Sequence, residues 1–153
     1  MSLINLVLFL YLLLYFVLAS QAVFYKLSFS NVFKKIPAQQ FINIRKLADP
    51  LLEARLPVFY YSSLAFGMSF IILAFYQGSM SAVLFASLAF VFLLADVLLA
   101  KKYNIPINLQ IRNMVEIPEI TAARFQQDWL RWIDIRGNFI LAGFCTLLLC
   151  AIL

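Results

Sequence analysis

Long apolar stretches alternate with polar, charged stretches along this chain. Four stretches are apolar almost throughout, at about residues 2–25, 56–76, 79–100 and 133–153. Because a helix needs about 20 apolar residues to cross the hydrocarbon core of a bilayer, the pattern predicts four membrane-spanning helices. The polar stretches 26–55 and 101–132 then form two long loops, and residues 1–153 form a single membrane domain.

Composition indicates the same class of protein. Of the 153 residues, 65% are apolar and only 12% are charged, whereas roughly 25% are charged in an ordinary soluble domain. The expected fold is therefore all-α, an integral membrane four-helix bundle. Its two long loops are expected to contain helices that lie at the membrane interface.

The positive charges are confined to the two loops and their borders. Six of the twelve Lys and Arg residues lie in residues 26–55, five lie in residues 101–132, and the last, Arg136, lies at the inner border of the fourth stretch. By the positive-inside rule, both long loops are cytoplasmic and both termini lie outside, as in a multi-pass protein of the plasma (inner) membrane. Since these cations border the membrane and accompany no RNA-binding motif, we expect membrane lipids as partners and no nucleic acid.

Prolines and small polar residues predict how the loops are built. A turn is expected at residues 28–31. Pro37 is placed to start an interfacial helix that runs to about Glu53, and Pro50 should kink it or end it early. Pro106 is expected to break any helix that continues from the third span.

The two halves of the chain resemble each other weakly. The segment 34–37, Lys-Lys-Ile-Pro, matches Lys101-Lys102 followed by Ile105-Pro106. This match predicts two hairpins related by an axis along the membrane normal, as in parallel repeats of transporters.

Four polar residues inside the predicted spans raise the question of function. Gln21 either bonds to a neighbouring helix or contacts a ligand. Asp96, near the inner end of the third span, either pairs with a loop cation or acts as a functional acid. Tyr60 and Tyr61 are typical of an aromatic belt at the membrane surface and need no further role.

The first loop carries charges at helical spacing. Arg45, Asp49 and Glu53 follow one another at i, i+4 positions, so they share one face of the expected helix. One interpretation is a solvated charge ladder on an interfacial helix. The other is that Arg45 and Asp49 help to wall a pocket that faces the cytoplasm.

The second loop concentrates the candidate chemistry. Asn108 can bond to exposed backbone or to a ligand carbonyl, and Asp134 is placed to pair with an arginine. Trp132 and Arg136 are i, i+4 neighbours, so the guanidinium is expected over the indole face. Together with Trp129, these groups either anchor the loop at the interface or form a pocket for a flat lipophilic ligand at the mouth of the bundle.

Several chemistries are excluded by what the sequence lacks. The chain has no His, and its two Cys residues, Cys145 and Cys150, lie in the fourth span. Imidazole-ligated haem, the usual zinc sites and His-based catalysis are therefore excluded. Because no Gly-rich phosphate-binding loop occurs either, we expect no cofactor and no metal site.

Two motifs carry a resemblance to a known family. Asn104-Ile105-Pro106-Ile107-Asn108, followed by Trp129 to Arg136 at the start of the last span, resembles the small four-helix membrane family that includes the fungal anthrone oxygenases. The segment 33–43 resembles that family's first loop. The resemblance implies a cofactor-free oxygenase acting on a polycyclic phenolic in some members and no assigned activity in most. Asn108, Trp132 and Arg136 match the pattern, whereas Asp134 stands where the family often has His.

Three functions remain open. In the first, the protein is an accessory subunit of a larger membrane complex, or a binder of a lipophilic aromatic or quinone-type ligand, alone or as a homo-oligomer. In the second, it is a cofactor-free enzyme in which Arg136 and Asn108 stabilise an oxyanion while Asp134 or Asp96 accepts a proton. The third, a small transporter, has less support because no span carries a central acid or base, and the one candidate, Asp96, lies near an end of its span.

Overall fold

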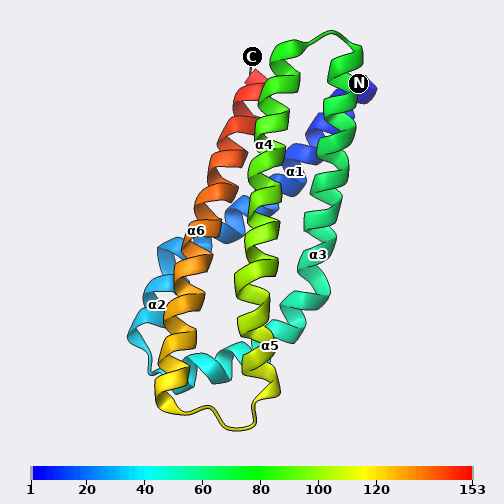
Figure 1. Cartoon of the computed structure of the whole chain (residues 1–153). Helices are drawn as coiled ribbons and strands as arrows, with labels where there is room; N and C mark the ends of the chain where they lie inside the picture. The colour runs from blue at the N-terminus through cyan, green and yellow to red at the C-terminus, as the bar shows by residue number, and fades with distance from the viewer. Residues whose placement is uncertain (1, 153) are drawn as a thin grey trace.

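Two helical hairpins pack together to form the protein, whose computed structural model describes residues 2–152. Both termini and the α3–α4 turn lie at one end of the bundle (Figure 1). The opposite end, which holds α2, α5 and the connections before α3 and α6, is called the polar end below. The elements are α1 (Leu3–Phe24), the π-helical segment η1 (Tyr25–Phe29), α2 (Ser30–Lys35), α3 (Ala38–Tyr76), α4 (Met80–Leu99), the π-helical segment η2 (Ala100–Asn104), α5 (Ile105–Asn113) and α6 (Glu119–Ile152).

Four continuous helical units are long and apolar enough to cross a membrane. The predicted all-α fold with four helices of membrane-spanning character is confirmed. Each unit is longer than the predicted span, because most residues of the two expected loops are helical. The units are Leu3–Lys35, Ala38–Tyr76, Met80–Asn113 and Glu119–Ile152.

The turn expected at residues 28–31 is wrong, because the helical backbone continues there. The Ser30 N–H donates to the Tyr25 carbonyl across a π turn, and α2 follows directly. Phe33 on α2 is buried and packs edge-on against Phe41 and Trp129. Burial of this aromatic side chain outweighs the low helix propensity of the serines and asparagine.

Helix α3 begins directly after Pro37, as expected, but it does not end near Glu53. It continues through Pro50 and Pro57 to Tyr76. Each internal proline removes one backbone N–H and bends a helix more readily than it ends one. In Figure 1, α3 starts across the polar end and then turns to run along the bundle. The expected interfacial helix and the second span are therefore one element.

Pro106 does not break the second hairpin. In η2 the Ile105 N–H donates to the Ala100 carbonyl, and Pro106 lies in the first turn of α5. A proline is tolerated in a first helical turn because its missing N–H leaves no bond unmade there. The π turn shifts the register of the backbone bonds just before it, so the third span continues to Asn113.

The two hairpins do share one order of elements: a helix, a π segment, a short helix and a long helix. The match of Pro37 with Pro106 is wrong, however, because Pro37 precedes a helix and Pro106 lies inside one. The counterpart of Pro37 is Pro118. Phe41 N–H donates to the Pro37 carbonyl at 3.1 Å, and Ala122 N–H donates to the Pro118 carbonyl at 2.9 Å.

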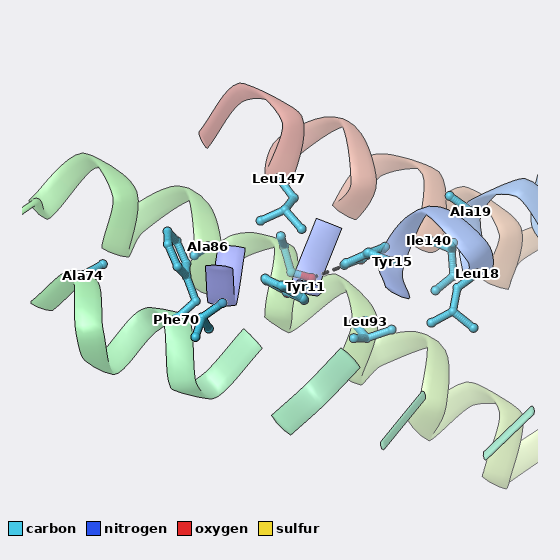
Figure 2. Packing of buried hydrophobic residues seen from close by; sticks show 12 residues of the cluster. Tyr11, Tyr15, Leu18, Ala19, Phe70, Ala74, Ala86, Leu93, Ile140 and Leu147 are labelled. Carbon is cyan, nitrogen blue, oxygen red and sulfur yellow. Dashed lines mark hydrogen bonds between the residues drawn. The ribbon is translucent and has the colours of Figure 1, made fainter. Parts of the chain in front are cut away.

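Two tyrosines of α1 form the centre of the bundle (Figure 2). Tyr11 and Tyr15 are fully buried. Tyr11 lies against Gly67 on α3, where an added Cβ would come within 2.8 Å of the ring. Tyr15 lies against Gly143 on α6 and donates its hydroxyl hydrogen to the Ala89 carbonyl on α4 at 3.1 Å. The glycines let α1 cross close to its neighbours, and the tyrosines fix its position.

A second buried cluster supports the polar end. Trp129 on α6 lies at its centre and packs against the rings of Tyr25, Phe33 and Phe41. The cluster joins α2, α3, α5 and α6 around the site described next. Its buried members are Phe33, Ala38, Phe41, Ile42, Ile111, Ile117, Ala122, Trp129 and Leu130.

Candidate functional site

A cavity of about 230 Å³ lies inside the bundle at the border between its polar end and its apolar length. All four helical units contribute to its wall. It brings together most of the residues predicted as a site, whereas Trp132 and Asp134 are not part of its lining. The predicted residues that line it are Gln21, Arg45, Asp49, Asp96, Asn108, Trp129 and Arg136.

Arg136 and Asp96 form an ion pair on one wall. The Nε of Arg136 donates to Oδ1 of Asp96 at 2.7 Å, and its Nη2 donates to Oδ2 at 3.4 Å. The side chains are 13% and 1% exposed, so water screens the pair little. Of the two roles predicted for Asp96, the structure bears out pairing with a loop cation, and that cation is Arg136.

Asn104 and Tyr60 complete the surroundings of Arg136, and the sequence analysis assigned neither of them to the site. Nη1 of Arg136 donates to Oδ1 of Asn104 at 3.2 Å, and Nη2 donates to the Tyr60 hydroxyl at 3.4 Å. Nδ2 of Asn104 donates to the Trp129 carbonyl at 3.3 Å. Tyr60 was expected only as part of an aromatic belt. Asn104 opens the motif Asn104-Ile105-Pro106-Ile107-Asn108, which was the one signal that could have pointed to it.

Trp129 connects this network to the opposite wall. Its indole Nε1–H donates to Oδ1 of Asn108 at 3.0 Å. The guanidinium of Arg45 lies over its ring, 4.2 Å from the centroid, a favourable cation–π geometry. The side chain is 2% exposed, so Trp129 has a structural position in the wall and is not a surface anchor.

Arg45 and Asp49 are buried, so the interpretation of a solvated charge ladder is wrong for them. They form an ion pair along α3, with side chains 4% and 7% exposed. The turn of α3 across the polar end directs this face into the bundle, where Trp129 covers it. Both residues line the cavity, and the expectation that this pocket faces the cytoplasm stays a prediction.

The cavity opens between α3 and the α4–α5 unit. Its exposed lining residues lie on these two units, and the rest of the lining is buried or half-buried. Arg112 on α5 donates to Glu53 on α3 at 2.6 Å across the opening. The exposed lining residues are Glu53, Tyr61, Lys101, Ile105, Leu109 and Arg112.

The predicted contact between Arg136 and Trp132 does not form. Trp132 instead stacks on Tyr103, with the centroids 3.5 Å apart and the planes 6° from parallel. Arg136 instead binds Asp96, whose carboxylate accepts from two of its nitrogens. Asp134 is half-buried and does not line the cavity. Within residues 2–152 it forms no ion pair with an arginine, and its role as a base stays a prediction.

The charges of the cavity are almost completely paired. Each of its three acids contacts an arginine: Asp49 with Arg45, Glu53 with Arg112 and Asp96 with Arg136. Within residues 2–152, no group of three or more His, Cys, Asp or Glu side chains is placed to hold a metal ion. The site therefore offers hydrogen bonds, aromatic faces and an apolar wall.

No protein-family model, curated protein or solved structure matches the chain. The resemblance to the anthrone oxygenase family thus rests only on the two short motifs and the segment 33–43. Of the residues that match that pattern, Asn108 and Arg136 line the cavity and Trp132 does not.

Proposed function

We propose that this protein binds a lipophilic ligand with a flat aromatic or quinone-type head in the cavity between its four helical units. The observation that carries the proposal is the convergence of polar and aromatic groups from all four units on one cavity. Such convergence of a few polar groups in a largely apolar cleft is characteristic of small-molecule sites.

The size of the cavity limits which ligands fit it. Its volume of about 230 Å³ is below the roughly 300–1,000 Å³ of sites for drug-sized ligands. A head of one or two rings fits this space better than a polycyclic phenolic does. An attached apolar chain would leave through the opening beside Tyr61 and Leu109, both of which are exposed.

The placement in the membrane follows from the cations. We place the polar end in the cytoplasm and both termini outside, because all twelve Lys and Arg residues lie in the polar half of the bundle. The cavity then lies at the inner border of the hydrocarbon core. A ligand dissolved in the bilayer reaches it through the opening between α3 and α5.

Catalysis and transport have less support as functions of this protein than ligand binding has. Both carboxylate oxygens of Asp96 already accept hydrogen bonds from Arg136, and Asp134 lies outside the cavity. A cofactor-free oxygenase would thus have to use an acid that is paired with an arginine, because Asp49 and Glu53 also form ion pairs, with Arg45 and Arg112. An accessory subunit remains the main alternative, in which the cavity is filled by lipid or by a partner.

The two tryptophans provide a test, because Trp129 lines the cavity and Trp132 does not. In nanodiscs, Trp132→Phe leaves Trp129 as the reporter, and Trp129→Phe leaves Trp132. Added 2-methyl-1,4-naphthoquinone should quench Trp129 fluorescence saturably and quench Trp132 only weakly and linearly. Equal, unsaturable quenching of both tryptophans, in a protein that purifies only with stoichiometric partners, would contradict ligand binding. It would support a function as an accessory subunit instead.

A further inference from the structure

Trp132 does not line the cavity and instead belongs to a pair of stacked aromatic rings near the polar end. Its indole lies against the Tyr103 ring, with the centroids 3.5 Å apart and the planes 6° from parallel. Tyr103 belongs to η2, which directly follows α4, and Trp132 lies on α6. This aromatic stack joins the two helices where their apolar lengths end, and both residues remain partly exposed.

A cation lies over each ring of the aromatic stack. The Nζ of Lys102 is 5.2 Å from the Tyr103 centroid, and the guanidinium carbon of Arg131 is 5.7 Å from the Trp132 centroid. Because the two stacked faces cover each other, the cations lie on the two outer faces. These cation–π contacts restrain the side chains, while their charges remain accessible because Lys102 and Arg131 are exposed.

No acid balances these two cations. Asp128 and Asp134 lie three residues before and after Arg131 on α6, but within residues 2–152 neither pairs with it, and Lys102 has no acidic partner either. In the same range the four side chains make no hydrogen bond to a protein group. An ammonium, a phenol, an indole and a guanidinium thus offer donors at one place, and an anion fits such a group of donors.

The surface beside the aromatic stack indicates the source of that anion. Val91, Leu94 and Leu98 are exposed and follow one face of α4 at i, i+3 and i+7 positions. Lys102 follows four residues after Leu98, at the polar end of this apolar face. A free phosphate would leave the apolar face uncovered, whereas the acyl chains of a phospholipid cover it while the headgroup meets the cations. Tyr and Trp rings are enriched at this level of a bilayer.

We propose that the aromatic stack and its two cations form a binding site for the headgroup of an anionic phospholipid, whose acyl chains lie along the exposed face of α4. The polar edges of the rings donate to the phosphate, and the cations attract its charge. None of the four side chains lines the cavity. The lipid site is therefore separate from the proposed ligand site and does not depend on it.

Quenching of Trp132 by brominated phospholipids tests the proposal. A Trp129→Phe variant has Trp132 as its only tryptophan. It would be reconstituted into vesicles of phosphatidylglycerol and phosphatidylcholine, with one of the two lipids brominated in the upper part of its acyl chains. The anionic lipid should occupy the surroundings of Trp132 with a preference of about fivefold. Because both leaflets have the same composition, the result does not depend on the orientation of the protein.

Three further variants in this background distinguish a specific site from general attraction by positive charge. Lys102→Gln/Arg131→Gln should lower the preference to about one. Lys34→Gln/Lys35→Gln removes the same charge from exposed positions on α2 and should leave the preference unchanged. Tyr103→Leu breaks the aromatic stack without changing the net charge, and the preference should fall about twofold.

Three outcomes would overturn the proposal. The first is equal quenching of Trp132 by the two lipids. The second is a preference that both double variants lower equally, or that Tyr103→Leu leaves unchanged, because general charge attraction would then explain it. The third is a Trp132 that neither lipid quenches, because a second copy of the chain or a partner protein would then cover the aromatic stack.

Discussion

Arg136 on α6 holds Asp96 on α4 through two of its nitrogens, at 2.7 and 3.4 Å. The residues are far apart in the sequence and meet where the apolar lengths of both helices begin. A buried ion pair recovers its desolvation cost only while both partners are present. The pair therefore makes the two helices depend on each other at this level.

Removing one partner should destabilise the protein more than removing both. We expect Asp96→Asn or Arg136→Gln alone to cost about 3 kcal/mol, because each leaves an uncompensated buried charge. The double variant should recover part of this loss. Denaturant unfolding in detergent micelles, followed by circular dichroism, measures all three.

The exposed pair of Glu53 and Arg112 is the matched control. Its side chains are 58% and 39% exposed, so Glu53→Gln should change the unfolding free energy by less than about 1 kcal/mol. Single variants of Asp96 and Glu53 with equal effects would contradict the assignment of a buried pair.

Gly143 should not tolerate a methyl group. An added Cβ would overlap the Tyr15 hydroxyl, so Gly143→Ala should displace Tyr15 and lower stability by about 2 kcal/mol. Gly137→Ala is the control, because its Cβ would come nearest to the flexible Lys26 side chain, at 3.3 Å, and would meet Ala22 at an ordinary contact distance of 3.9 Å. Thermal unfolding of the two variants compares them, and an equal effect would argue against the close approach of α1 and α6.

The contact between Glu53 and Arg112 should control access to the cavity. Arg112→Gln removes the only ion pair between the described parts of α3 and α5, so the naphthoquinone probe should associate faster, with little change in unfolding free energy. A Glu53→Cys/Arg112→Cys variant, crosslinked by a bismaleimide in a chain whose Cys145 and Cys150 are replaced by serine, should associate more slowly. Stopped-flow quenching of Trp129 measures both rates. If the crosslink leaves the association rate unchanged, the probe enters the cavity by another route.

The orientation in the membrane can be measured with single cysteines in the same serine background. A cysteine at Ser79, in the α3–α4 turn, should react with an impermeant maleimide added to intact cells. A cysteine at Lys34 should react only after the cells are opened, because the positive-inside rule places it in the cytoplasm. The reverse pattern would invert the proposed topology.

The sequence alone predicted the four spans well, because the need for about 20 apolar residues acts on each segment separately. It did not predict how the segments between the spans fold. Pro106 favours a break in the helix, but a π turn removes the conflict at that position. The serines near residue 28 favour a turn, but the segment is helical and Phe33 is buried. Both outcomes depend on contacts with other helices, which a local pattern does not contain.

The candidate site was predicted in part for the same reason. Arg45 and Asp49 were identified from their spacing, but their burial depends on the bend of α3 and on Trp129 above them. The sequence predicted a contact between Arg136 and Trp132, because Trp132 lies four residues earlier on the same face of the helix. The true partner, Asp96, lies on another helix. Spacing along the sequence identified the polar residues of the site. Their partners depend on how the helices pack against one another.

The two hairpins share one order of elements, and Gln21 and Asp96 occupy equivalent positions in it. Each lies one turn before the π segment of its hairpin, and each lines the cavity. Two identical hairpins assembled as separate chains would carry the same residue at both equivalent positions. Two copies of the second hairpin would carry two acids and two arginines, and two copies of the first would carry two amides at these positions. Joining unlike hairpins in one chain allows an acid to face an amide, so the cavity holds one ion pair here and one neutral group that can turn toward a ligand.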